Sequence, residues 1–321
     1  MNATGTYFRL WELRSNAGFD RRDDQTGRTR AELANDSARG NVVADAYYYE
    51  FDASEMSFSS YIIARTAGKP LLAIPIFPSR AFRHSYVFIN TKSSIKEPRD
   101  LAGKRVALKE FQKTAAVWLR GILAQDYGVA IDKIHWLEWA RRRSMELEVP
   151  SRYDVTRLPA GNSADQLLIN GDIDALICTS LFPSFVWGHP GIRRLFENYQ
   201  EVEVAYFKRT RIFPIMHTVV MREELWRTCP WIAPSLFKAF QESKQLAYCR
   251  VNDLSPYKLS LAWFREPVRE QRDILGDDPW SNGLAANRKT VETLIDYVYE
   301  QGFADRKLSP EELFAPNTLS L

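Results

Sequence analysis

The sequence predicts an α/β protein built from two lobes. From about residue 46 onward, apolar runs with strand-like alternation are separated by amphipathic runs of helical period, which favours a parallel or mixed sheet covered by helices. A short pattern also occurs twice, as "FPSRAFRHSYVFI" from Phe77 and as "FPIMHTVVM" from Phe213. Each copy contains a histidine, a small hydroxyl residue and an apolar strand. Two such strands, one on each side of an α/β block, predict two connections between lobes.

The N-terminal region stands apart from this pattern. It is polar, rich in Arg and Asp, and follows neither the strand nor the helix period. We therefore expect residues 1–45 to form a divergent, poorly ordered segment, with "YFRLWEL" as the only candidate for a first strand. Lobe 1 is then expected to comprise residues 46–83 and 222–321, and lobe 2 residues 84–221.

The first half of the foldable region predicts five elements. Glycine and Lys-Pro breaks end the helical patterns, and alternating apolar residues mark the strands. In chain order these elements are a helix closing at Gly68, the strand Leu71–Phe77, a strand over residues 85–90, a strand ending at Leu108, and a helix closing at Gly128 with Thr114 as N-cap.

The second half continues with further strands and then becomes mainly helical. The run "SADQLLINGDIDALICTS" predicts a helix, a Gly-Asp turn and the buried strand Ala175–Cys178. "FPIMHTVVM" predicts another strand. The last hundred or so residues contain two clear helical patterns, "PWIAPSLFKAFQESKQLAYC" and "NRKTVETLIDYVYEQGF".

Composition narrows the class of function. The 43 basic and 40 acidic residues give a net charge of +3, too balanced for a nucleic-acid surface. No apolar window is long enough for a membrane span, and the N-terminus lacks a signal-peptide pattern. Cys178, Cys229 and Cys249 are widely spaced without a CxxC motif, which favours free thiols in a reducing compartment. We therefore expect a cytoplasmic protein.

The chain resembles a known family at several places. "KEPRDLAGKRVALKEFQKTAAVWLRGIL" and the later "GDIDALI" are similar to the second lobe of the type 2 periplasmic-binding-protein fold, as found in binders related to sulfonates and thiamine precursors. Within that superfamily, five further segments together resemble the 4,5-dihydroxyphthalate decarboxylases. They are "EFDASEMSFSSY", "AIPIFPSRAFRHS", "YQEVEVAYFKRTRIFPIMHTVVMREEL", "PWIAPSLFKAF" and "NGLAANRKTVETLIDYVYEQG".

The resemblance implies a carboxy-lyase with its ligand in an interlobe cleft, converting 4,5-dihydroxyphthalate to protocatechuate and carbon dioxide. Such a reaction needs a base near a hydroxyl, an acid near a ring carbon, and cations for a carboxylate. His84 and His217 suit proton transfer, with Glu55 as a residue that orients a histidine or accepts a catechol proton. Arg80 and Arg83 suit a carboxylate clamp. The alternatives are that the histidines are unrelated strand-edge residues and that an arginine makes only surface ion pairs.

Further residues are expected to bind the substrate. Gln112 and Thr114 lie just before or at the start of a helix, where free N–H groups can hold an anion, although Thr114 can equally serve as a simple cap. Ser180 follows a predicted strand at its carboxyl end, where open α/β sheets bind ligands. Thr218 follows the second histidine. Asp277 and Asp278 could line the same cleft or form a helix-capping turn.

Cofactors and competing functions complete the prediction. No cofactor is required by the implied reaction; a divalent metal held by Glu55, His84 and His217 is an alternative without a local ligand spacing to support it. The expected binding partner is a small aromatic carboxylate, with no nucleic acid and no membrane. Assembly of the chain into a homo-oligomer is an open alternative to a monomer. The leading competitor is a non-enzymatic solute-binding protein of an ABC-type transporter that captures an aromatic acid. A third hypothesis is a related enzyme acting on a different hydroxylated aromatic acid.

Overall fold

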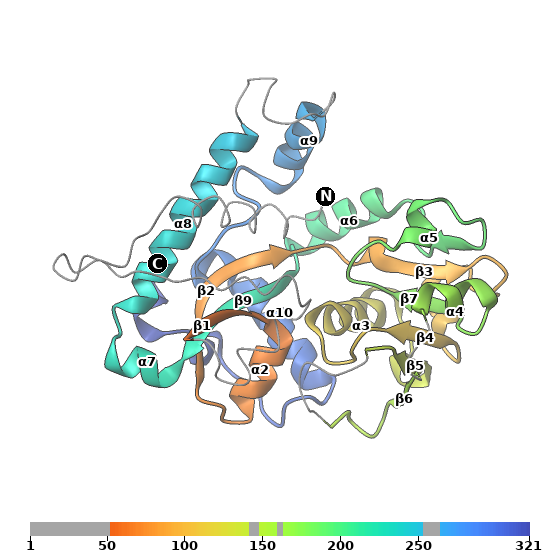
Figure 1. Ribbon diagram of the computed structural model, residues 1–321, viewed down its shortest axis with the longest axis horizontal. Helices are drawn as coiled ribbons and strands as arrows, with labels where there is room; N and C mark the ends of the chain where they lie inside the picture. The colour runs from red at the N-terminus through yellow and green to blue at the C-terminus, as the bar shows by residue number, and fades with distance from the viewer. Residues whose placement is uncertain (1–51, 141–147, 159–162, 253–263) are drawn as a thin grey trace.

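Two β-sheets lying side by side organise the molecule (Figure 1). The computed structural model describes residues 52–140, 148–158, 163–252 and 264–321. In these residues the strand orders are β1-β9-β2 and β6-β5-β4-β7-β3-β8. The candidate strand "YFRLWEL" and the expected poorly ordered segment 1–45 lie outside the described residues.

The three-stranded sheet joins segments that are far apart in the chain. Its central strand is β9 (Ile215–Arg222), with β1 (Ala53–Ser57) and β2 (Leu71–Arg80) antiparallel on either side. Residues of β9 alternate between two apolar clusters: Val219 and Met221 pack in one with Phe237, whereas Val220 packs in the other with Leu294. Helix α8 (Ile232–Val251) therefore covers one face of this sheet, and helices α2 (Phe58–Thr66) and α10 (Leu284–Glu300) lie on the other.

The six-stranded sheet is mixed, as the sequence predicts. Strands β4, β5, β6 and β7 run parallel, and β3 pairs antiparallel with β7 and β8. The strand bounds are β3 (Val87–Asn90), β4 (Arg105–Leu108), β5 (His135–Glu138), β6 (Asp154–Arg157), β7 (Ala175–Ile177) and β8 (Ile192–Arg194). The remaining helices are α3 (Thr114–Tyr127), α4 (Ala164–Asn170), α5 (Pro183–Val186), α6 (Tyr199–Thr210), α7 (Glu223–Thr228), α9 (Arg265–Leu275) and α11 (Pro310–Leu313).

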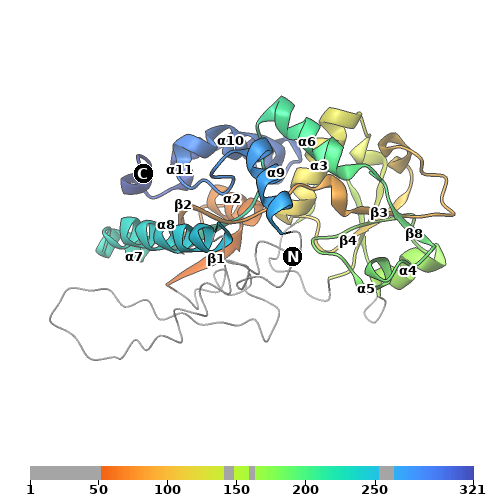
Figure 2. The ribbon, with the colours of Figure 1, turned by 90° about the horizontal axis from the view of Figure 1, so that it is seen from above.

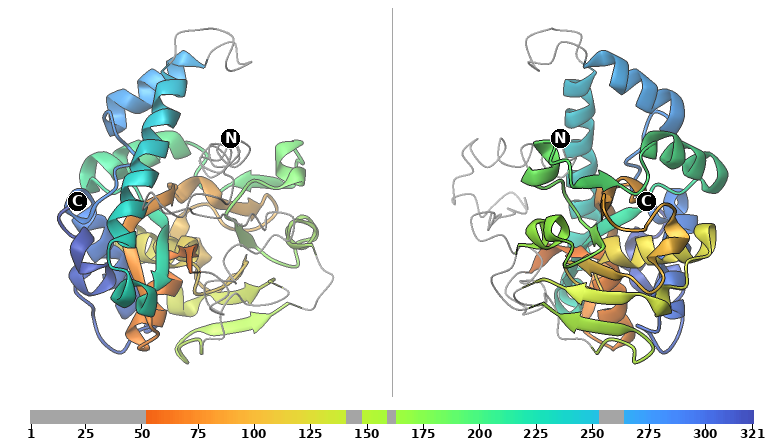
Figure 3. Two further views of the ribbon diagram at one scale, coloured as in Figure 1. Left: turned by 60° about the vertical axis from the view of Figure 1, so that its left-hand side comes forward. Right: turned by 90° about the vertical axis from the view of Figure 1, so that its right-hand side faces the viewer.

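Figure 2 gives the view from above, in which the strands of the two sheets again occupy opposite halves. The C-terminal part of α8 and helix α9 extend beyond the sheets, as both views of Figure 3 show. In the part of the chain that the structure describes, no helix combines the length and apolarity needed to cross a membrane. Cys178, Cys229 and Cys249 are free thiols.

Several element boundaries differ from the predicted ones for local reasons. Thr114 is the first residue of α3, and Lys113 is its N-cap, so the predicted capping role of Thr114 is wrong. Residues 84–86 form a 3₁₀ turn, and the strand begins only at Val87. The expected helix end at Gly128 is confirmed, because this glycine adopts the left-handed conformation with φ 62°. Strand β9 pairs with β1 and β2 of the three-stranded sheet, although the sequence predicts that residues 84–221 belong to lobe 2.

Helix α3 connects the two sheets. It follows β4 of the six-stranded sheet, yet the indole N–H of Trp118 donates to the carbonyl of Ile215 in β9 at 2.9 Å. Gly121 allows α3 to lie close against α10, because a Cβ there would meet the Tyr297 ring at 2.3 Å. Tyr297 also donates to Gln125 Oε1 at 2.9 Å. The helix packing therefore requires a residue without a side chain at position 121.

We expect Gly121→Ala to lower the unfolding temperature. Alanine improves helix propensity by about 1 kcal/mol, but forcing a buried ring aside costs up to about 3 kcal/mol, so steric overlap wins. Thermal unfolding of the wild type and the variant measures the difference. The matched control is the double variant with Tyr297→Leu, in which the alanine should cost less; an equal or larger loss in the double variant would contradict the proposed clash.

Candidate active site

A histidine and a glutamate form the centre of the candidate site. In the pairing of β1 with β9, Glu55 lies opposite Val219, and Ser57 lies opposite His217. The Glu55 and His217 side chains are therefore diagonal neighbours on one face of the sheet. His217 Nδ1 lies 2.5 Å from Glu55 Oε1. The two side chains keep 28% and 23% of their surface exposed, so a ligand can reach them. With Nδ1 held by the carboxylate, Nε2 is the ring nitrogen that can exchange a proton with a ligand.

A cluster of buried hydroxyls adjoins this pair. Ser57, the cross-strand partner of His217, lies with its Oγ 2.7 Å from Thr114 Oγ1. Thr114 Oγ1 also accepts from the backbone N–H of Ser59 at 3.0 Å, and the Thr114 N–H donates to Ser57 Oγ at 3.3 Å. These bonds fasten the end of β1 to the first turn of α3. Thr114 is therefore brought next to the His217 strand pair, but the residue is 2% exposed and its hydroxyl is already bonded within the protein.

The loop before α3 is also cross-linked by side chains. Gln112 is buried, its Nε2 donates to Glu110 Oε2 at 3.0 Å, and its carbonyl accepts from Ser59 Oγ at 2.6 Å. Lys113 Nζ lies 2.7 Å from Glu110 Oε1. The loop is held by its own charged residues, and the role of Gln112 in binding a substrate stays a prediction.

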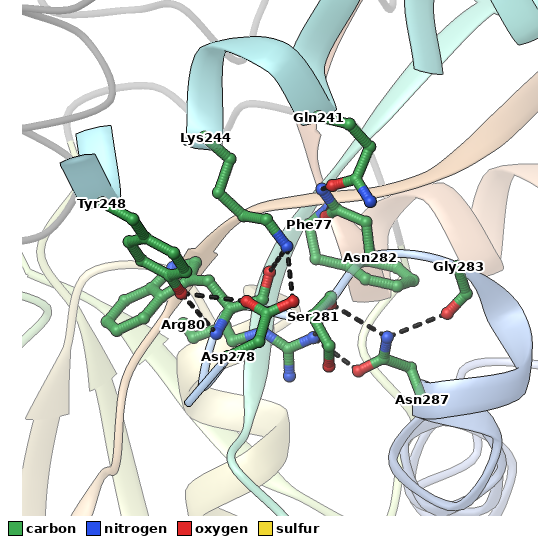
Figure 4. Close-up of polar contacts among 11 residues, drawn as sticks. Phe77, Arg80, Gln241, Lys244, Tyr248, Asp278, Ser281, Asn282, Gly283 and Asn287 are labelled. Atoms are coloured by element: carbon green, nitrogen blue, oxygen red, sulfur yellow. Dashed lines mark hydrogen bonds and ion pairs between the residues drawn. The ribbon is translucent and has the colours of Figure 1, made fainter. Parts of the chain in front are cut away.

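Arg80 lies at the end of β2 and is 6% exposed. Its Nη1 donates to the carbonyl of Phe213 at 3.1 Å, and its Nη2 donates to the carbonyl of Ser281 at 2.7 Å and to Asn287 Oδ1 at 2.5 Å. Figure 4 shows the Arg80 guanidinium beside Ser281 and Asn287. These contacts tie β2 to the start of α10. They differ from the open carboxylate clamp that the sequence predicts for this residue.

Arg83 is 3% exposed and stacks on an aromatic ring. Its guanidinium carbon lies 4.2 Å from the centroid of the Tyr86 ring, and its Nε donates to the carbonyl of Phe82 at 3.0 Å. Burial lowers the pKa of Arg83 to about 10, with the nearby Tyr86 and Glu203 opposing that change. Its Nη2 has no hydrogen-bond partner among the described residues. Arg83 thus keeps one buried donor without a partner among the described residues, and its role in binding a carboxylate stays a prediction.

His84 is enclosed by aromatic rings. The ring centroids of Phe196, Tyr206 and Tyr127 lie 5.2, 5.4 and 6.0 Å from its own, all in edge-on arrangements. The residue is 1% exposed, and neither ring nitrogen has a hydrogen-bond partner among the described residues. Burial lowers its pKa to about 4, and the charge of Arg209 adds to that effect. The structure therefore makes His84 a neutral core residue, unlike the partly exposed His217.

The other predicted substrate-binding residues lie in different settings. Ser180 is exposed just after β7, at the carboxyl end of a parallel strand. Thr218 is fully buried, and its hydroxyl donates to the carbonyls of Ile74 and Ile76 at 3.2 Å each. Asp278 accepts from Lys244 Nζ at 2.6 Å, and Asp277 is paired with Arg272. Asp278 thus stabilises the contact between α8 and the segment before α10.

The hypothetical ligand set of Glu55, His84 and His217 is not assembled. Glu55 and His217 are in contact, whereas His84 is surrounded by Tyr127, Phe196 and Tyr206. Over residues 52–140, 148–158, 163–252 and 264–321, no three His, Cys, Asp or Glu side chains are grouped so that they could hold a metal ion.

Curated relatives decide the family. No protein-family model matches the chain. The 4,5-dihydroxyphthalate decarboxylase of Comamonas testosteroni is 37% identical over 276 residues, which are 84% of this chain and 84% of that protein. The chain belongs to the 4,5-dihydroxyphthalate decarboxylase family. The enzyme of the same name from Pseudomonas putida is 34% identical over 165 residues, which are 50% of this chain and 64% of that protein.

Solved structures place this decarboxylase-family chain in a wider fold group. A periplasmic sulfonate-binding protein from Methylobacillus flagellatus superposes with a TM-score of 0.54 at 14% identity, over 89% of this chain and 78% of that one. The ligand-binding component of an ABC-type import system from Staphylococcus aureus superposes with a TM-score of 0.52 at 10% identity, over 99% of this chain and 95% of that one. At such identities the likeness shows the fold alone, and it confirms the two-lobed periplasmic-binding-protein-like fold that the sequence predicts.

Sequence reasoning missed several residues around the decarboxylase-family site. Ser57 and Ser59 make the hydroxyl contacts to Thr114, and Glu110 holds Gln112. The only local signal was the spacing of small polar residues in "SEMSFSS", which is unusual in an otherwise apolar run. Thr114, the partner of both serines, is more than 50 residues away from them in the chain, so no local pattern predicts these two contacts.

The enclosure of His84 predicts loss of stability in acid. Because its folded-state pKa is about 4 against an ordinary 6.5, the unfolded chain binds the proton more tightly. The free energy of unfolding should therefore fall as the pH drops from 6.5 towards 4, by about 3 kcal/mol from this residue. Urea unfolding between pH 4 and 8 measures it.

We expect His84→Gln to flatten this dependence, since glutamine does not titrate. The matched control is His135→Gln, because His135 is exposed and pairs with Asp154 on the surface. His135→Gln should leave the pH dependence of the free energy of unfolding unchanged. If His84→Gln also leaves it unchanged, His84 is not its source.

Proposed function

We propose that this chain is a carboxy-lyase that converts 4,5-dihydroxyphthalate to protocatechuate and carbon dioxide. Its membership of the 4,5-dihydroxyphthalate decarboxylase family supports the reaction. The observation that carries the chemistry is the partly exposed Glu55–His217 pair, which offers a proton-transfer group to a bound ligand. A solute-binding protein needs anion contacts and has no use for such a pair.

The substrate itself supplies the electronic driving force. Each carboxylate of 4,5-dihydroxyphthalate lies para to a hydroxyl, so loss of the hydroxyl proton feeds electrons to the carbon that bears the carboxylate. Protonation of that carbon, cleavage of its bond to the carboxylate and release of carbon dioxide restore the aromatic ring. One proton leaves the hydroxyl and one proton reaches the ring carbon. The electron pair of the broken bond returns through the ring to the phenolate oxygen, which takes up a proton again, so the net reaction replaces carbon dioxide by one proton.

His217 is proposed to carry one of these two proton transfers through Nε2. The contact of Nδ1 with Glu55 fixes the orientation of the ring, and the carboxylate stabilises the imidazolium that forms when Nε2 accepts a proton. Arg83 is proposed to bind the carboxylate that stays on the ring, because its buried Nη2 has no partner among the described residues. Ser180, at the carboxyl end of β7, stays a predicted contact.

We further propose a cytoplasmic enzyme. The three free thiols support this location, because reducing compartments keep cysteines unpaired. Its proposed ligand is a small aromatic carboxylate. A homo-oligomer and the absence of membrane or nucleic-acid partners stay predictions.

Turnover by purified protein tests the function. We expect the wild type to form protocatechuate from 4,5-dihydroxyphthalate, as followed by liquid chromatography. His217→Gln should lower kcat by about 10²- to 10⁴-fold while substrate binding is retained, because only the proton transfer is removed. Glu55→Gln should lower kcat by a smaller factor, since the ring keeps a neutral partner.

The matched control is His135→Gln, which removes a histidine from a comparable carboxylate pair on the surface. Its kcat should equal that of the wild type. Tight binding of 4,5-dihydroxyphthalate by the wild type without any product would overturn the enzyme and leave the solute-binding protein as the function.

The proposed reaction does not require a resident metal or organic cofactor, because the ring of the substrate holds the electron pair. We expect kcat to be unchanged after dialysis against a chelator and to be insensitive to added divalent ions. Metal analysis of the same samples provides the control. Activity that is lost on chelation and restored by one ion would contradict this part of the proposal.

A further inference from the structure

His217 lies between two irregularities in the pairing of β9 with β2. Ile74 pairs with Val219, and Ser79 pairs with His217. Between these two pairs the chain advances five residues along β2 but only two along β9, so β2 contains three residues without a partner in the ladder. The register shifts again before Arg80 pairs with Ile215. The extra segment includes Pro75 and Pro78, which have no N–H to donate to a ladder. Bulges of this kind change the direction of neighbouring side chains.

The backbone groups that this bulge frees have specific partners. On the β9 side, the hydroxyl of Thr218 donates to the carbonyls of Ile74 and Ile76 at 3.2 Å each. From the segment before α10, Gly283 N donates to the carbonyl of Pro75 at 2.8 Å, and Asn282 Oδ1 accepts from Phe77 N at 3.0 Å. Figure 4 shows Asn282 beside Phe77.

Arg80 closes the bulge at its far end. Its bonds to the carbonyls of Phe213 and Ser281 hold the last residue of β2 to the residues before β9 and before α10. The bulge is therefore fixed by Thr218 from within the sheet and by the segment 281–283 from outside it.

We propose that Thr218 is a positioning residue for His217. Its hydroxyl fixes the β2 bulge, and the bulge sets the direction in which His217 projects towards Glu55 and the substrate. Thr218 is fully buried and lies on the face of β9 opposite His217, so it acts through the backbone. The catalytic part of this inference rests on the proposed function, whereas the effect on the His217 ring does not.

The test compares Thr218→Val, which removes the hydroxyl at nearly constant volume, with Thr218→Ser, which keeps it. Thr218→Val should lower kcat about 10- to 100-fold with KM little changed. Thr218→Ser should keep most of the wild-type kcat. NMR of the histidine rings, without substrate, should show changed chemical shifts of His217 in Thr218→Val. The chain has 4 histidines, so assignment by single substitutions is practicable.

The matched control is Thr318→Val. Thr318 is also fully buried and donates to a backbone carbonyl, that of Ala315, at 2.7 Å. Both variants should lower the unfolding temperature, but only Thr218→Val should alter the His217 signals. If Thr218→Val does not fold, Asn282→Ala, which frees Phe77 N on the other side of the bulge, should produce the same change.

Unchanged His217 signals in the folded bulge variant would overturn the inference. If the wild type forms no product, the proposed function fails, and the NMR comparison still decides whether Thr218 positions His217.

Discussion

The pairing of β9 between β1 and β2 is the interaction on which the rest of the structure depends. It brings together Glu55 and His217, which are 162 positions apart in the chain. It also places Ser57, the last residue of β1, beside the first turn of α3. A shift of one residue in this register would turn His217 to the opposite face of the sheet. Long-range strand pairing, and not any local motif, therefore creates the candidate active site.

Buried cations stabilise the frame around that site. Arg120 is fully buried, with its guanidinium carbon 3.7 Å from the centroid of the Phe111 ring and its Nε bonded to Gln301 Oε1 at 2.8 Å. Lys244 is 1% exposed and bonded to Asp278 (Figure 4). Removing such charges from water is costly unless polar or aromatic partners surround them. Each cation therefore fixes the relative position of the elements that supply its partners, here α3 with α10 and α8 with the segment before α10.

The sequence predicted those parts of the fold that local patterns determine. Apolar periodicity and a terminal glycine were sufficient for α3, and the turn at Gly171 followed by an apolar run was sufficient for β7. The contact of Glu55 with His217 was a hypothesis only, because the family resemblance suggested both residues but no spacing joined them. The setting of His84 could not be predicted, since its aromatic neighbours come from α3, α6 and the residues before α6.

The two histidine motifs show why a repeated pattern does not imply repeated chemistry. Both "RHS" and "MHT" precede or begin an apolar strand, and that shared position explains the likeness. At the first, a 3₁₀ turn directs His84 into the core. At the second, strand alternation leaves His217 partly exposed and buries Thr218 on the other face. In a strand, adjacent residues face opposite sides, so a catalytic side chain and the residue that positions it can be neighbours in sequence without sharing a surface.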